Sequence, residues 1–179
     1  MTMLAHYHEH YTVSDYEAWE GDWELIEGNA YAMAPSPSFT HQKLSLKIAR
    51  LLDEALDGCN ECEAVIEMDV ALGVDTVVRP DVMVLCYTPR EHPNRAPDIV
   101  FEVISPATAK RDEILKFELY RQEGVRYYVI VYPDGQKAKC FRLHEGQYIK
   151  IGDFFDEHYR FELDKCSIDF DFGFIWPKS

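Results

Sequence analysis

The chain has 179 residues, of which 47% are hydrophobic and 28% are charged, and its formal net charge is −14. No stretch approaches the roughly 18 uninterrupted apolar residues that a membrane-spanning helix needs, and residues 1–10 lack the basic and apolar regions of an export signal. The composition therefore argues against a membrane protein and predicts one domain over residues 1–179, located in the cytoplasm.

The negative charge bears on nucleic-acid binding, because Lys and Arg that neutralise phosphates supply most non-specific affinity for DNA. A cluster of carboxylates that holds divalent cations is itself acidic, however, and the bound cations reverse the local sign. The charge therefore predicts weak, salt-sensitive binding to DNA and does not exclude a nuclease.

Five cysteines are an odd number in a chain long enough to fold without covalent staples, so we expect free thiols rather than a disulfide framework. Cys59 and Cys62 form one CxxC pair. A structural zinc site would need a second pair at comparable spacing, whereas Cys86, Cys140 and Cys166 stand singly. A redox or zinc protein built on the CxxC pair ranks third among the functional hypotheses.

The N-terminal part predicts a frayed end, a short helix and a hairpin. Residues 1–10, with His6, His8 and His10 in alternation, are expected to fray. Ser14 and Glu17 form an apparent capping box for a short helix. Residues 23–27 and 30–34 then predict two strands joined by a turn.

The middle of the chain predicts a helix followed by two strands. Apolar residues recur at helical spacing over residues 38–56, after a proline-rich breaker. Residues 64–72 and 77–85 predict two strands, and residues 73–75 form the turn between them.

Residues 98–104 are nearly all apolar, as in a strand that is covered on both faces. Residues 107–122 predict a helix that Gly124 ends. Further strands are predicted at residues 127–131, 138–143 and 148–151. Strand, helix and strand in this order imply a crossover between parallel strands. The predicted fold is α/β, of the α+β kind, with a mixed sheet flanked by helices and an N-terminal hairpin.

Residues 153–179 form a C-terminal extension that is rich in carboxylates and ends in a cluster of apolar residues. Such a cluster would give a monomer more exposed apolar surface than the edge of a single subunit should have, so we predict a homodimer that uses this extension. The alternative is that the apolar residues cover the subunit's own core. The cluster consists of Phe170, Phe172, Phe174, Ile175 and Trp176.

Asp81 and Glu102 carry the strongest functional signal. Each lies in a run of apolar residues, where an ionised carboxylate is costly unless a metal ion or a buried cation compensates it. Hard oxygen ligands of this kind suit Mg²⁺ or Mn²⁺, which support phosphodiester hydrolysis. The alternative is a buried salt bridge, of Asp81 with Arg79 or of Glu102 with Lys116.

The order of these motifs resembles the PD-(D/E)XK nuclease superfamily, with Pro80 and Asp81 as the PD and Glu102 as the (D/E). More narrowly, it resembles a bacterial restriction-endonuclease family over roughly residues 11–155. The matching motifs are ELIEG at 24–28, PSP at 35–37, His41, RPDV at 79–82, FEVISP at 101–106, Asp112, Lys116, Tyr120, Gly124 and Val125.

The resemblance implies a restriction-endonuclease-like fold with Asp81, Glu102 and Lys116 as catalytic residues. Ile104 stands where the superfamily has its lysine, and Lys116 on the following helix is the candidate replacement. The Val103 carbonyl joins the two carboxylates as a third metal ligand.

Five residues are candidates for supporting roles in this site. Asp112, Lys116 and Tyr120 recur at intervals of four, which places them along one helix face. The alternative is that Asp112 and Lys116 form an ordinary surface pair. The supporting candidates are Glu24, Glu27, His41, Asp112 and Tyr120.

Two functions remain open from the sequence. The first is a Mg²⁺- or Mn²⁺-dependent endonuclease that hydrolyses DNA. The second is a non-catalytic, dimeric binding or regulatory protein with a nuclease fold. The acidic charge and the missing lysine at Ile104 favour the second.

Overall fold

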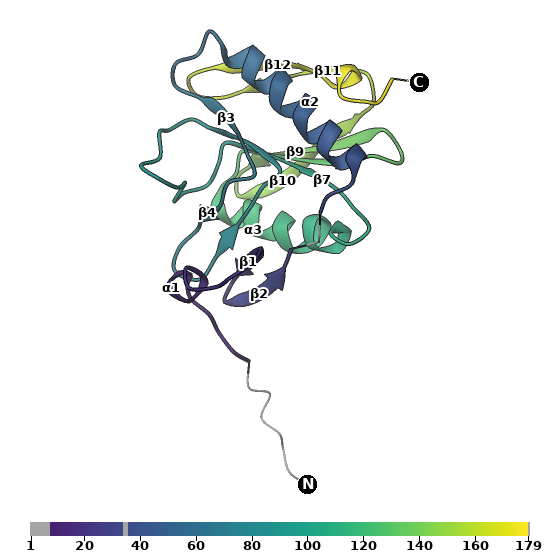
Figure 1. Ribbon diagram of the computed structural model, residues 1–179. Coiled ribbons are helices and arrows are strands. Elements are labelled where there is room, and N and C mark those ends of the chain that lie inside the picture. The colour runs from purple at the N-terminus through teal and green to yellow at the C-terminus, as the bar shows by residue number, and fades with distance from the viewer. Residues whose placement is uncertain (1–7, 34–35, 179) are drawn as a thin grey trace.

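The computed structural model describes residues 8–33 and 36–178, and its largest element is a six-stranded sheet (Figure 1). Only β7 and β8 run parallel, and the other neighbours are antiparallel, which confirms the mixed sheet. The strands in spatial order are β10 (Gln147–Phe154), β9 (Lys137–His144), β8 (Tyr127–Tyr132), β7 (Ile99–Val103), β6 (Val82–Leu85) and β3 (Glu63–Ile66).

Two smaller sheets pack against this central sheet. One has the order β2-β1-β5-β4, and its β1–β2 pair is the predicted N-terminal hairpin. The other is the C-terminal hairpin of β11 and β12. Their strands are β1 (Trp23–Ile26), β2 (Asn29–Ala32), β4 (Val70–Ala71), β5 (Val77–Val78), β11 (His158–Glu162) and β12 (Ser167–Asp171).

The prediction of two continuous strands over residues 64–72 and 77–85 is wrong. Both strands break, so that β3 and β6 stay in the central sheet while β4 and β5 pair in the small one. At the break Pro80 has no N–H to donate to a ladder, and Glu67 has a positive φ of 46°. The break matters for the site because it places Asp81 where the chain leaves one sheet and enters the other.

The long helix α2 (Phe39–Leu56) confirms the prediction for residues 38–56, with Ser38 as its N-cap. The first helix, α1 (Val13–Tyr16), is capped by Thr12, so the predicted box at Ser14 is two residues late. Thr12 accepts from the Asp15 N–H while the Asp15 carboxylate accepts from the Thr12 N–H, which satisfies both donors.

The predicted helix over residues 107–122 starts later and has two parts. Ser105 and Thr108 hydrogen-bond to each other in a local turn, which competes with helix formation. A π-helical segment, Arg111–Leu115, follows and leads into α3 (Lys116–Glu123). Gly124 ends α3 with a φ of 84°, which confirms the predicted stop. A short 3-10 turn, Phe172–Phe174, lies near the C-terminus.

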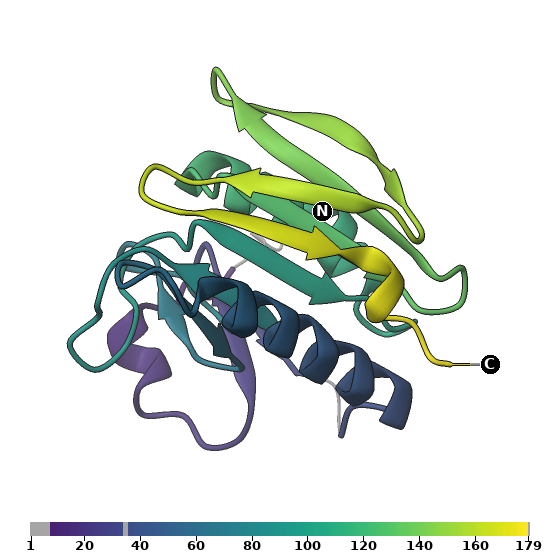
Figure 2. The same ribbon diagram turned by 90° about the horizontal axis from the view of Figure 1, so that it is seen from above.

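Each face of the central sheet carries its own core, as strand alternation requires. Val82 and Val84 of β6 face α2 and the C-terminal hairpin, while Met83 and Leu85 face α3 and the small N-terminal sheet. Figure 1 shows this layering, with α2, β11 and β12 on one side and α3, β1 and β2 on the other. Figure 2 shows α2 running alongside the C-terminal hairpin.

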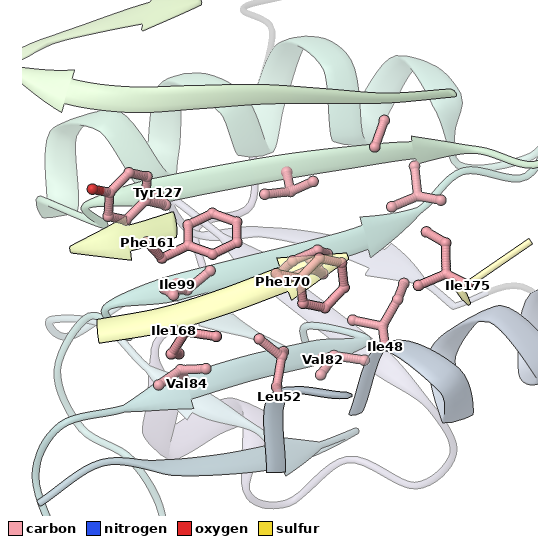
Figure 3. Close-up of a cluster of buried hydrophobic side chains, with 14 of the residues drawn as sticks. Ile48, Leu52, Val82, Val84, Ile99, Tyr127, Phe161, Ile168, Phe170 and Ile175 are labelled. Atoms are coloured by element: carbon pink, nitrogen blue, oxygen red, sulfur yellow. The ribbon is translucent and has the colours of Figure 1, made fainter. Parts of the chain in front are cut away.

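The C-terminal aromatic residues belong to the first of these cores (Figure 3). Phe170, Phe172 and Ile175 are fully buried, and Trp176 is 8% exposed. The Phe101 ring packs against Phe170 at 5.3 Å between centroids. Phe174 alone of the cluster is exposed. The argument for a homodimer through this cluster is therefore wrong, because these side chains cover the subunit's own core.

Three further predictions concern the termini, the cysteines and membranes. The predicted fraying falls mainly on residues 1–7, outside the described residues, and His10 pairs with Asp75 at 3.1 Å. The prediction of free thiols is wrong for four cysteines, and only Cys140 is free. In the described part of the chain, every helix is too short or too polar to cross a membrane. The two disulfides are Cys59–Cys166 and Cys62–Cys86.

The place of Phe170 in the core leads to a stability prediction. Phe170→Ala should lower the free energy of unfolding by about 3–5 kcal/mol, because it leaves a cavity between β12 and the central sheet. Phe174→Ala is the matched control, since that ring is 63% exposed. Urea unfolding of both variants measures the difference, and equal losses would contradict the assignment of the hairpin to the core.

Candidate functional site

Strand pairing brings Asp81 and Glu102 together. Val82 lies opposite Phe101 in the β6–β7 register, so one step further along places Asp81 opposite Glu102. The Asp81 N–H donates to Glu102 Oε2 at 3.3 Å, and the Val103 N–H donates to Asp81 Oδ2 at 2.7 Å. Both side chains line one cleft on the face of the sheet that α3 covers.

Lys116 lies at the centre of a buried ionic network. Its Nζ is 2.7 Å from Glu24 Oε1, 2.9 Å from Glu102 Oε1 and 3.8 Å from Asp112 Oδ1. The lysine itself is only 4% exposed. The alternative of an ordinary surface pair with Asp112 is therefore wrong. The buried Glu102–Lys116 salt bridge, which the sequence offered as the alternative to a metal at Glu102, is confirmed.

Glu24 is more central than its place in a hairpin suggested. It is 2% exposed, and its carboxylate accepts from the Arg79 N–H at 3.0 Å and from Arg111 Nη1 at 3.2 Å. The apolar residues Leu25 and Ile26, which follow Glu24, were the signal in the sequence that this strand is buried. In the structure β1 is buried from Glu24 to its end. Arg111 was not predicted at all.

Tyr120 and Asp112, which share the predicted spacing of four with Lys116, both lie in this network. The Tyr120 hydroxyl donates to Glu102 Oε1 at 2.9 Å, and the residue is fully buried. Asp112 is 3% exposed and lies in the π-helical segment. The Glu102 Oε1 atom thus accepts from both Lys116 and Tyr120, which fixes its orientation.

His41, near the start of α2, approaches the same carboxylates from the opposite layer. Its Nε2 lies 3.2 Å from Asp81 Oδ2. Burial alone would lower the pKa of His41, but the hydrogen bond and the charge of Asp81 raise it above its ordinary value. The other ring nitrogen, Nδ1, is buried and has no hydrogen-bond partner among the described residues.

Two residues singled out from the sequence lie elsewhere. Glu27 is exposed at the β1–β2 turn with a positive φ of 49°, and it does not line the cleft. It sits in the turn that follows β1 rather than on the strand. Arg79 pairs with Asp22 and Asp69, not with Asp81.

The cleft has a volume of about 980 Å³, and acidic residues outnumber basic ones along it. Its acidic residues are Asp22, Glu24, Glu67, Asp81, Glu102, Asp112 and Asp134. Its basic residues are Arg79, Arg111 and Lys116, together with His41. This excess of negative charge in a concave, partly buried site attracts cations.

The network shifts the protonation of its members. Burial raises the pKa of Glu102 well above its ordinary range, although Lys116 opposes the shift. Burial also raises the pKa of Asp112 to about 6. Burial would lower the pKa of Lys116, but Glu102, Glu24 and Asp112 raise it well above its ordinary value, so the ammonium stays charged.

The donor set fits a hard divalent cation. Asp81 Oδ1 receives no hydrogen bond from any described residue, and Glu102 Oε2 receives only the long one from the Asp81 N–H. Apart from the cysteines, no three His, Cys, Asp or Glu side chains of the described residues have ligand atoms within 4.8 Å of one another. Two carboxylates with backbone and water oxygens suit Mg²⁺, which keeps several waters.

Comparison with solved structures identifies the class of fold. The chain is similar to the crystal structure of a "putative nuclease belonging to DUF820" from Anabaena variabilis, with a TM-score of 0.74 and 15% sequence identity. The similarity covers 93% of this chain and 97% of the other. The fold is restriction-endonuclease-like, as the PD-(D/E)XK resemblance implied.

Comparison with family profiles then identifies the family. Residues 13–160 match the profile of the Uma2 family, described as "Putative restriction endonuclease". The match spans most of the 179 residues, and the chain belongs to this family. No curated protein matches it.

The raised pKa of Asp112 predicts how stability depends on pH. The folded state holds a proton on Asp112 between its ordinary value of 3.8 and about 6, whereas the unfolded state does not. The folded state therefore loses stability as pH rises through this window, because it binds more protons there than the unfolded state does. The raised pKa of His41 acts with the same sign at higher pH.

Asp112→Asn should make the stability of the fold depend less on pH, while the fold itself stays largely unchanged. Thermal melting of the metal-free protein at several pH values from about 4 to 6 should show a smaller decline for Asp112→Asn than for the wild type. Glu123→Gln is the control, since Glu123 is exposed at the end of α3 and makes no ion pair with a described residue. Parallel curves for wild type and Asp112→Asn would contradict the shift.

Proposed function

We propose that the protein is a divalent-metal-dependent endonuclease that hydrolyses DNA phosphodiester bonds. One observation carries the proposal: the Lys116 ammonium contacts Glu102, although Ile104 occupies the superfamily's lysine position. A lysine from α3 thus supplies, at the (D/E) carboxylate, the charge that the strand lacks. The fold and the family support this assignment.

We assign the ligands of the metal to the carboxylates of Asp81 and Glu102 and to the Val103 carbonyl. Mg²⁺ or Mn²⁺ bound there would supply Lewis acidity toward a phosphoryl oxygen and a water of lowered pKa. The Val103 N–H and His41 Nε2 hold the Asp81 carboxylate in one orientation. Tyr120 holds the Glu102 carboxylate from the other side.

Lys116 has two roles in this proposal. It balances the buried carboxylates of Glu24 and Glu102, and its positive charge stabilises the negative charge that develops on the scissile phosphate. Glu24 and Asp112 position the ammonium, with Glu24 the closer of the two at 2.7 Å. Arg111 donates to Glu24 Oε2 and adds a second positive charge to the cleft.

DNA is the proposed substrate, and the acidic cleft makes its binding weak and salt-sensitive. Arg79 is occupied by Asp22 and Asp69, so it contributes little free charge toward a phosphate. Cleavage should therefore depend steeply on divalent cation, which lowers the repulsion between cleft and substrate. A homodimer and a cytoplasmic location stay predictions. The C-terminal apolar residues no longer support the dimer, because they are buried within the subunit.

Cleavage of supercoiled plasmid in Mg²⁺ or Mn²⁺ tests the proposed function. Wild type should nick or linearise the plasmid, and Asp81→Asn should reduce the rate by at least about 100-fold, because a ligand and a charge are lost. Asp69→Asn is the matched control, since Asp69 pairs with Arg79 outside the ligand set. Wild type that binds metal and plasmid without cutting would support the non-catalytic binding protein instead.

A second test concerns Lys116. Lys116→Met should abolish cleavage and also lower the free energy of unfolding by about 3–5 kcal/mol, because it leaves buried carboxylates without a cation. Glu24→Gln combined with Lys116→Met removes one of those carboxylates and should recover part of the stability. The double variant should stay inactive, as measured by plasmid cleavage beside urea unfolding.

If the refolded double variant cut at the rate of Glu24→Gln alone, Lys116 would be a structural cation and not part of the chemistry. The comparison with Glu24→Gln is needed because Glu24 also contacts Arg111 and the Arg79 N–H. The two readouts together separate a loss of folding from a loss of charge stabilisation.

A further inference from the structure

Four cysteines that are far apart in the sequence converge at one place, away from the carboxylate cleft. Cys59 and Cys62 lie between α2 and β3, Cys86 follows β6, and Cys166 lies in the turn between β11 and β12. The β3–β6 register sets Glu63 opposite Leu85, and one step further it sets Cys62 opposite Cys86. Three separate parts of the fold therefore supply thiols to one site.

The sulfurs of Cys59, Cys62 and Cys166 are close enough to share one ion, and the sulfur of Cys86 adjoins them through its bond to Cys62. The Sγ atoms of Cys59, Cys62 and Cys166 all lie within 4.8 Å of one another. The fourth, on Cys86, is bonded to Cys62, and Cys59 is bonded to Cys166. A tetrahedral Zn²⁺ with Zn–S bonds of about 2.3 Å needs sulfurs about 3.8 Å apart, so the two sulfurs of each disulfide must separate on reduction and Cys86 must turn toward Cys59 and Cys166.

We propose that, in the reduced protein, Cys59, Cys62, Cys86 and Cys166 bind one structural Zn²⁺. A thiol or phosphine reductant delivers four electrons and four protons to the two disulfides and yields four thiols. Binding of Zn²⁺ then releases four protons and forms four zinc–thiolate bonds, with no change in oxidation state of the metal. The disulfide form and the zinc form are alternative states of the same cluster.

The backbone holds each contributing segment in place. The Cys59 N–H donates to the Leu56 carbonyl at the end of α2, and the Cys86 N–H donates to Asp98 Oδ2. The Leu163 N–H donates to the Cys166 carbonyl and closes the hairpin turn. These bonds do not involve the sulfurs, so reduction of the disulfides does not remove them and the backbone of each ligand stays in place.

The chemistry and position of the cluster make it a structural site. Soft thiolates select zinc, whereas the hard carboxylates of Asp81 and Glu102 select magnesium or manganese. Asp81 precedes β6 and Cys86 follows it, so the two sites are about 16 Å apart at about 3.3 Å per residue. A zinc here would tie the end of α2 and the C-terminal hairpin to the central sheet, around the first core.

Cobalt titration of the full chain tests the proposal. The protein is reduced with a phosphine, exchanged without oxygen into metal-free buffer, and titrated with Co²⁺, whose thiolate complexes absorb in the visible and near-ultraviolet. In wild type the thiolate spectrum should saturate at one Co²⁺ per chain with the bands of a tetrahedral thiolate site, and Zn²⁺ should abolish those bands. Cys140→Ser is the matched control and should bind equally, since Cys140 is buried apart from the cluster.

Cys86→Ser and Cys166→Ser should each weaken Co²⁺ binding by more than about 100-fold. Loss of a residue that only hydrogen-bonds to a metal ligand already lowers metal affinity by about 10–100-fold. Asp81→Asn should leave the thiolate spectrum unchanged, which separates this site from the proposed nuclease site. Folded, reduced wild type whose four cluster thiols are free but which gives no cobalt–thiolate spectrum would overturn the proposal. Equal cobalt binding by Cys86→Ser and Cys166→Ser would overturn it as well.

Discussion

The ammonium of Lys116 joins carboxylates from three parts of the fold. Glu24 comes from the small N-terminal sheet, Glu102 from the central sheet and Asp112 from the π-helical segment before α3. Burying such charges costs several kcal/mol per ion, which is recovered only where geometry and hydrogen bonding are good. The network therefore exists only when both sheets and the helix are assembled, and the second core is what holds them in that arrangement.

The same network leaves the site with more negative than positive charge. Lys116 and Arg111 oppose the carboxylates of Glu24, Glu102 and Asp112, with Asp81 beside them. In the metal-free protein, burial first and this excess of negative charge second raise the pKa of Asp112 and of Glu102, which favours their protonated forms. A divalent cation would balance this excess instead, so cation binding and folding stability are linked at this cleft.

The sequence predicted what depends on local pattern and missed what depends on distant packing. The helix over 38–56 and the carboxylates of Asp81 and Glu102 stood out from their apolar neighbours. The convergence of the cysteines and the burial of Phe170 could not be predicted, because both depend on where the C-terminal hairpin docks. Glu24 was underrated for the same reason, since a hairpin acid is buried only if another layer covers it.

The π-helical segment explains both the presence of Arg111 at the site and its absence from the prediction. Arg111 and Lys116 are five residues apart, and both contact the Glu24 carboxylate. In an α-helix of 3.6 residues per turn, such residues would lie about 140° apart around the axis. A π-helical turn joins residues i and i+5, and here the Lys116 N–H donates to the Arg111 carbonyl. The wider turn thus brings two cations to one carboxylate, an arrangement that a search at intervals of three and four cannot detect.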